Sequence, residues 1–224
     1  MMFFELLWCR LDTLIASFFF NEQEIATQSG FSTIIMLTDC FAYGFGLTTA
    51  AMISRFIIQL KVNDAKKTAF VACFTILSLG ALISIIVYTE AKLLAKMLIK
   101  DEETQESLEK IIKLYSPAIP IELLQGPVYA IVRSIGKQNY MVFCQLLSNY
   151  LVHFLVMYYC VTVSNYTNEA IVIACMCTFA CMSLSSLMVA FLSDWTKEAN
   201  KIRDEFVEAN NEMESVEDNL FEFN

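Results

Sequence analysis

The sequence predicts an all-α integral membrane protein, a bundle of six transmembrane helices, and two observations support this prediction. Of its 224 residues, 57% are hydrophobic, whereas soluble domains average about 45–50% apolar residues. The apolar residues also gather in long runs with charged connectors between them, the pattern of a chain that crosses a bilayer several times. The short alternating strands of a β-barrel do not occur in this pattern.

Six apolar runs are long enough to cross about 30 Å of hydrocarbon, which takes roughly 20 helical residues. They cover residues 1–20, 30–58, 68–88, 111–132, 140–163 and 170–192. The first run is not typical of a signal peptide, because it contains Glu5, Arg10 and Asp12 and lacks a small-residue cleavage site. We therefore predict a six-span domain over residues 1–193. An acidic cytoplasmic tail follows over residues 194–224, a short surface helix that becomes partly disordered.

Basic residues favour one orientation of the bundle. With the N-terminus in the cytoplasm, nine Lys and Arg residues fall on cytoplasmic connectors and five on the opposite side, which is the usual bias. Asn165-Tyr166-Thr167 matches an N-glycosylation acceptor and would lie on the outer side. The expected location is the plasma membrane or an endomembrane, with the lipid bilayer as a partner.

Composition argues against several classes of function. A nucleic-acid binder needs a basic face, and this chain has a net charge of −9. The eight cysteines lie in apolar runs without a CxxC pair, which favours buried apolar side chains over a metal site or disulfides. No HExxH, Ser/His or paired-carboxylate pattern occurs, and His153 is the sole histidine. We therefore expect neither an enzyme nor a cofactor.

Ionisable residues inside membrane spans cost about 2.5–3.5 kcal/mol each on insertion scales, so each is a candidate for function. The six candidates are Glu5, Arg10, Asp12, Asp39, Glu122 and His153. Glu122 is the strongest, because three prolines interrupt its span at positions 117, 120 and 127. A carboxylate beside a broken membrane helix is typical of a transport cavity.

Structural interpretations of these residues remain open. Glu122 is alternatively a buried carboxylate that forms hydrogen bonds between helices. Asp39 could cap a bend near Gly44 and Gly46. His153, in an apolar run, is more typical of an inter-helix hydrogen-bond donor than of a proton relay.

At the end of the fourth span, Gln125-Gly126 is followed by Arg133, Gly136 and Gln138. This spacing resembles the QG-x6-RG-x-G-x-Q stretch in the tenth helix and the following loop of the multidrug and toxic compound extrusion (MATE) transporters. The order of several further motifs resembles the C-terminal half of a eukaryotic member. The resemblance covers about residues 1–200. Within it, Glu122 falls where many eukaryotic members carry an acidic residue that lines the cavity of the C-terminal lobe.

Other segments resemble the family less closely. Glu5-Leu6-Leu7 falls at the family's E-W-W, Gly44-Phe45-Gly46 at its G-x-G, and residues 194–197 at its N-W-x-K/E. The second acid of the family's seventh helix falls on Arg10, which replaces an attraction for cations with a repulsion. The family's R-V-x-N motif corresponds to residues 55–58 of this chain, which lack its Asn.

The resemblance implies a fold and a function. Family members have two six-helix lobes that face each other as a V, twelve spans in all, and this chain would be one lobe. Its partner would be a missing N-terminal lobe or a second half-size subunit. We expect a chain that begins at an internal Met, because only four residues precede Glu5.

The function implied is the export of organic cations or xenobiotics in exchange for protons or sodium. A protonated carboxyl group would release its proton and take up the cation. The expected substrate and proton site consists of Glu122, Glu5, Asp12, Gln125, Tyr129 and Asn149. The alternatives are a degenerate lobe that acts as a membrane scaffold or regulator, which Arg10 favours, and an ion pore, which the lack of a Gly-rich loop disfavours.

Overall fold

The computed structural model describes residues 20–163 and 168–222, and every regular element in this part of the chain is helical, as predicted. The elements are α2 Glu22–Ile58, α3 Val62–Thr89, α4 Ala91–Leu98, α5 Glu102–Tyr115, the 3₁₀ turn η1 Ser116–Ala118, α6 Ile119–Ser134, α7 Gln138–Leu146, the π-helix η2 Leu147–Val152, α8 His153–Val163, α9 Asn168–Leu192 and α10 Trp195–Glu222. The all-α membrane fold class is confirmed.

Four helices of the described chain are long and apolar enough to cross a membrane: α2, α3, residues 138–162 and residues 169–192. They are the second, third, fifth and sixth predicted spans. The fourth span forms α5, η1 and α6 instead of one helix, and the first span lies outside the described residues except for Phe20. The four spanning helices therefore coincide with predicted spans, although α2 begins at Glu22, ahead of the predicted start at residue 30.

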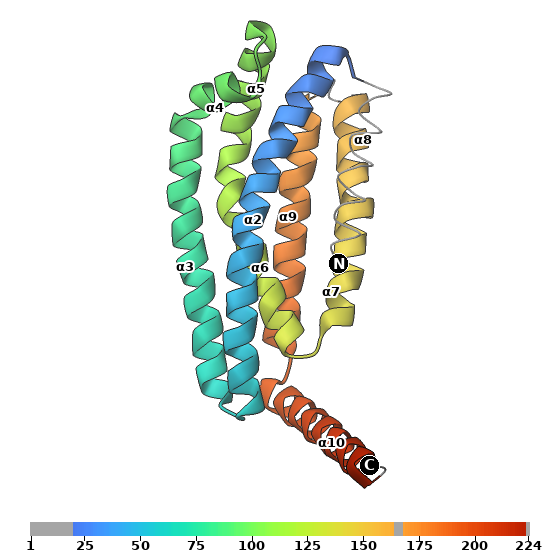
Figure 1. Cartoon of the computed structure of the whole chain (residues 1–224). Helices are drawn as coiled ribbons and strands as arrows, with labels where there is room; N and C mark the ends of the chain where they lie inside the picture. Colours follow the sequence, from blue (N-terminus) through green and yellow to red (C-terminus); the bar gives the residue numbers. More distant parts are fainter. Residues whose placement is uncertain (1–19, 164–167, 223–224) are drawn as a thin grey trace.

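The helices run side by side, and α10 leaves the bundle at an angle (Figure 1). Helix α6 lies at the centre, where it packs against α2, α3 and α9. The connectors α2–α3 and α6–α7 lie at the same end as the start of α10, while α4 and the start of α5 lie at the other end (Figure 1). This matches the predicted grouping of the connectors on two sides.

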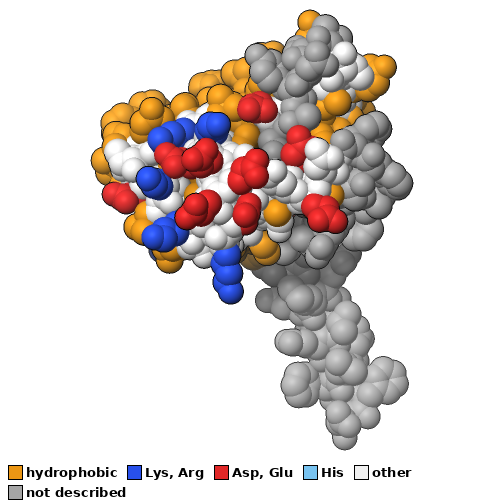
Figure 2. Space-filling view, turned by 90° about the horizontal axis from the view of Figure 1, so that it is seen from above, with side chains coloured by type: hydrophobic (Ala, Val, Ile, Leu, Met, Phe, Trp, Pro, Cys, Tyr) orange, Lys and Arg blue, Asp and Glu red, His pale blue; other side chains and the backbone are white. Residues whose placement is uncertain are grey.

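The outside of the bundle is apolar, as lipid contact requires. On α3, Phe70 is 73% exposed and Phe74 66%. The end with α4 and α5 is polar, and Figure 2 shows Lys, Arg, Asp and Glu side chains gathered there with hydrophobic side chains around them. At this end Asp101 caps α5, because its carboxylate accepts hydrogen bonds from the Thr104 amide and hydroxyl, which lower the pKa of Asp101.

Close contacts at three glycines fix the position of α6. A methyl group on Gly126 would lie 2.0 Å from the carbonyl oxygen of Ala42, and one on Gly46 would lie 2.7 Å from that of Gly126. One on Gly80 would lie 2.8 Å from the Cα atom of Pro120. The backbone of α6 therefore touches those of α2 and α3, as small residues allow in membrane bundles.

The prolines interrupt the fourth span less than predicted. The helix breaks at η1, but α6 continues through Pro127 to Ser134. A proline leaves the carbonyl four residues earlier without its amide donor. For Pro117 this is the backbone carbonyl of Lys113, which accepts a hydrogen bond from the Ser116 hydroxyl at 3.0 Å. For Pro120 it is Ser116, which accepts one from the Ser84 hydroxyl of α3 at 2.7 Å.

Candidate functional site

Three of the predicted site residues lie on one face of α6. Glu122, Gln125 and Tyr129 are spaced i, i+3 and i+7, which places them within about 60° of one another around the helix. The exposed fraction rises along this face, from 1% at Glu122 to 9% at Gln125, and Tyr129 is half-buried. The Tyr129 hydroxyl donates to Gln125 Oε1 at 3.3 Å. The structure therefore places these three predicted site residues side by side on one face of α6.

Both carboxylate oxygens of Glu122 have hydroxyl partners from other elements. The Thr38 hydroxyl of α2 donates to Oε1 at 2.6 Å. The hydroxyl of Tyr115, the last residue of α5, donates to Oε2. Tyr115 is itself buried, with its ring edge-on to Phe31 at a centroid distance of 5.0 Å. Glu122 thus joins three helices, which agrees with the interpretation of it as an inter-helix hydrogen-bonding group.

A second carboxyl group lies beside Glu122. Asp39 of α2 interacts with the Glu122 side chain across the contact between α2 and α6. Asp39 is exposed, whereas Glu122 is buried. The acidic pair therefore extends from the core of the bundle to its surface. Asp39 does not cap a bend, because α2 runs unbroken through Gly44 and Gly46.

The surface around Asp39 has further features that the sequence did not reveal. Met36 and Tyr43 lie on the same face of α2 as Asp39, at i−3 and i+4, and are 66% and 48% exposed. A carboxylate flanked by a polarisable thioether and an aromatic ring is suited to an organic cation. The helical spacing of 36, 39 and 43 is the signal from which this surface could have been found.

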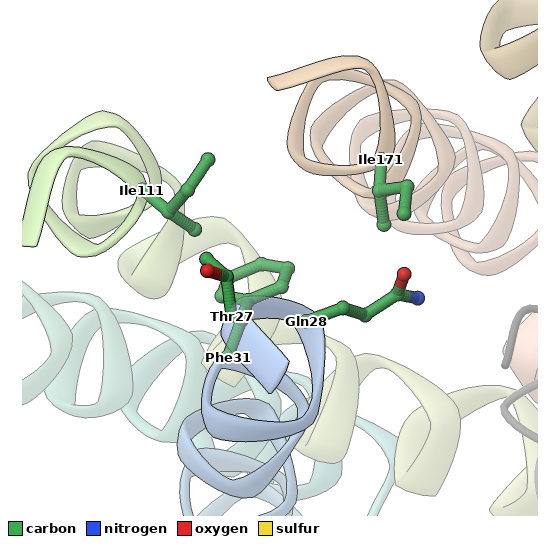
Figure 3. Close-up of a pocket in the computed structure, with 5 residues that line it drawn as sticks. All are labelled: Thr27, Gln28, Phe31, Ile111 and Ile171. Atoms are coloured by element: carbon green, nitrogen blue, oxygen red, sulfur yellow. The ribbon is translucent and has the colours of Figure 1, made fainter. Parts of the chain in front are cut away.

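The sequence predicts that Glu122 lies beside a transport cavity, and among the described residues its side chain is enclosed. It is 1% exposed, and the hydroxyls of Thr38 and Tyr115 contact its two oxygens. Figure 3 shows a depression elsewhere, between Thr27, Gln28 and Phe31 of α2, Ile111 of α5 and Ile171 of α9. It is too narrow to hold a water molecule. Within the described residues, Glu122 is thus the buried member of the acidic pair and Asp39 the exposed one.

The fifth span carries a second buried polar group of residues. Asn149, a predicted site residue, is 2% exposed and lies in the π-helix η2, which the sequence did not predict. The helix η2 packs against α7, α8 and α9, so Asn149 is not part of the α6 face that carries Glu122. His153, next along the chain, is fully buried, and its Nδ1 lies 3.4 Å from the Thr178 hydroxyl of α9. This contact agrees with an inter-helix role for His153.

The remaining predicted residues lie outside the described part of the chain. They are Glu5 and Asp12 of the predicted site, Arg10, and the glycosylation tripeptide at 165–167. In the described residues the cysteines are free, and no group of three His, Cys, Asp or Glu side chains is placed to hold a metal ion.

Comparisons with known proteins agree with this architecture. Residues 1–159 match the profile of a protein family described as MatE. The fold is similar to that in the crystal structure of the eukaryotic MATE transporter AtDTX14, with a TM-score of 0.80 and 14% sequence identity. The similarity covers 88% of this chain and 44% of that chain, so this chain spans less than half of that transporter's length. The search of curated proteins gave no significant match.

Proposed function

The chain belongs to the MATE family of membrane transporters, and from this premise we propose that it forms one lobe of an antiporter that exports organic cations or xenobiotics. The observation that carries the proposal is the acidic pair of Glu122 and Asp39 between α6 and α2. An acidic pair that reaches from the core to the surface can hold a proton at one end and meet a cation at the other.

Asp39 provides the entrance of this site. It lies near the middle of α2, a helix long enough to cross the membrane, yet its side chain is exposed. A charged group at that depth is costly against lipid and is expected to face protein or water. The face with Met36, Asp39 and Tyr43 is therefore proposed to line the cavity toward a second lobe or a half-size partner. An organic cation would bind there.

Glu122 provides the proton site, and the proton is favoured over sodium as the coupling ion. Its two oxygens already accept hydrogen bonds from the Thr38 and Tyr115 hydroxyls. Burial of the side chain disfavours the charged carboxylate and so favours a bound proton on Glu122, whereas a metal ion needs several oxygens placed around it. A cation at Asp39 then favours release of the proton from Glu122 by electrostatic repulsion. The lobes would alternate between two orientations, driven by the differential affinity of cation and proton.

Uptake into proteoliposomes tests this proposal. The full native polypeptide is reconstituted, and transport of a fluorescent organic cation is driven by a proton gradient in one arm and a sodium gradient in the other. We expect Glu122→Gln to lower proton-driven uptake at least tenfold, and Asp39→Asn to raise the KM for the cation. Asp64→Asn is the matched control, because Asp64 forms an exposed pair with Lys67 at 3.9 Å at the start of α3, away from Glu122 and Asp39.

Two results would count against the proposal. Unchanged uptake in Glu122→Gln removes this carboxylate from the transport cycle. An absence of uptake in the native protein under both gradients favours the scaffold or regulator instead.

A further inference from the structure

Beyond Glu122, three helices bury polar side chains in the part of the bundle nearest α10. Gln125 of α6 is 9% exposed, and Gln145 of α7 and Ser186 of α9 are each 2% exposed. Buried polar side chains are rare inside membrane bundles, because hydrocarbon offers no hydrogen bonds to them. Their relative positions follow from two printed contacts between helices.

The first contact places Gln125 level with Ser186. The Ser183 hydroxyl of α9 donates to the carbonyl oxygen of Ile121 in α6 at 3.2 Å. Both helices run from this contact toward the α10 end (Figure 1). Gln125 lies four residues beyond Ile121, about 6 Å along the axis, and Ser186 lies three beyond Ser183, about 4.5 Å.

The second contact places Gln145 at the same level. Helices α7 and α8 run antiparallel to α9, and His153 meets Thr178 at 3.4 Å. Gln145 lies eight residues before His153, and Ser186 lies eight after Thr178. Equal counts in opposite directions bring the two side chains to within about one helical turn of each other. All three helices that carry these residues pack against one another.

Two polar atoms of this group lack a partner among the described residues. They are Gln125 Nε2 and Ser186 Oγ. A buried polar atom without a hydrogen bond costs about 1–3 kcal/mol, and buried waters typically meet such groups where two to four polar partners converge. Gln125, Ser186 and Gln145 lie at the same height in the bundle, so their polar groups together supply the partners that a buried water needs.

We propose that Gln125, Tyr129, Gln145 and Ser186 form a hydrated path from Glu122 to the α10 end of the lobe, along which protons leave Glu122. This inference rests on the proposed function. Glu122 would give its proton to the first water, and each water would pass one proton on, so that one proton leaves the path for each one released. Tyr129, half-buried one turn beyond Gln125, is the mouth of the path.

Thiol labelling tests whether water enters. In membrane vesicles of the full native polypeptide, Ser186→Cys is treated with a charged methanethiosulfonate from the α10 side, and labelled peptides are quantified by mass spectrometry. Leu184→Cys is the matched control, because Leu184 lies two residues away on α9 and is 63% exposed on the apolar surface. Only a thiolate reacts, and thiolates do not form in hydrocarbon. We expect Ser186→Cys to label at least tenfold faster than Leu184→Cys.

A second pair of variants tests the role of Gln125. Added to Ser186→Cys, Gln125→Leu should lower labelling several-fold, whereas Gln125→Asn, which keeps the amide, should restore it. Equal labelling of Ser186→Cys and Leu184→Cys would overturn the hydrated path. Labelling as expected without any proton-driven uptake would leave the path standing and contradict the proposed antiporter alone, because labelling does not depend on transport.

Discussion

At the scale of residues, burial separates two carboxyl groups that the sequence treats alike. Asp39 and Glu122 both fall within apolar runs, but the Asp39 side chain is exposed whereas that of Glu122 is buried, with an exposed fraction of 1%. The hydroxyls of Thr38 and Tyr115 complete the surroundings of Glu122. Spacing along α6 could predict that Glu122, Gln125 and Tyr129 share a face, but it could not predict partners from other helices.

Glycine contacts allow a residue-scale prediction of stability. Gly126→Ala places a methyl group 2.0 Å from the carbonyl oxygen of Ala42, so α2 and α6 must separate. Overpacking of this kind typically costs about 1–3 kcal/mol. We expect a lower thermal midpoint in detergent, measured by circular dichroism. Gly44→Ala is the control, because a methyl group at Gly44 meets nothing within 4 Å. Equal midpoints for the two variants would contradict the close contact.

At the scale of elements, the fourth span shows how a broken helix is stabilised. The sequence predicted a break from its prolines, and the structure places it at η1, with Pro127 accommodated inside α6. Serine hydroxyls from the same span and from α3 donate to the carbonyls that lose an amide donor at Pro117 and Pro120, and the Ile119 amide also donates to the Ser116 carbonyl. Glu122 follows directly after this break, so the serines help to hold the acidic pair in place.

Removal of one such hydroxyl tests this account. Ser84→Ala removes the inter-helix donor to the Ser116 carbonyl, which keeps the Ile119 amide as a donor, and inter-helix hydrogen bonds in membranes average about 0.6 kcal/mol. We expect Ser84→Ala to lower the free energy of unfolding in mixed micelles by about that amount or more. The control is Ser78→Ala, also on α3, whose exposed hydroxyl bonds only its own helix at Phe74. A loss in Ser78→Ala as large as in Ser84→Ala would contradict the role of Ser84.

At the scale of the whole molecule, α10 is attached to the end of the bundle. The predicted short surface helix is longer than expected, Trp195–Glu222. Its first turns dock through buried Trp195 and Ala199 and through an ion pair between Glu198 and Lys137 of the α6–α7 connector, at 2.7 Å. Gly136, with φ of 75°, shapes this connector beside Ile202.

The ion pair predicts how docking depends on charge. The hydrogen bond to Glu198 raises the pKa of Lys137 above its usual 10.5. Its contribution is therefore present at neutral pH and is lost as the pH rises through the raised value. We expect Glu198→Gln, or an alkaline titration, to release α10, detected by Trp195 fluorescence in a Trp8→Phe background. Glu205→Gln, which breaks an exposed pair with Lys201 at 3.7 Å, should leave the signal unchanged. An equal change in both variants would exclude the Lys137 pair as the anchor.

The sequence by itself determined the fold class, the positions of the spans and the sides of their connectors, because these depend on apolar length and on local charge. It also determined that a carboxylate lies beside a proline break. The tertiary structure alone decided that Asp39 meets Glu122, that Tyr115 and Thr38 close the core side of the site, and that a π-helix carries Asn149. These contacts join helices far apart along the chain, and their register depends on glycine contacts and freed carbonyls between neighbouring backbones.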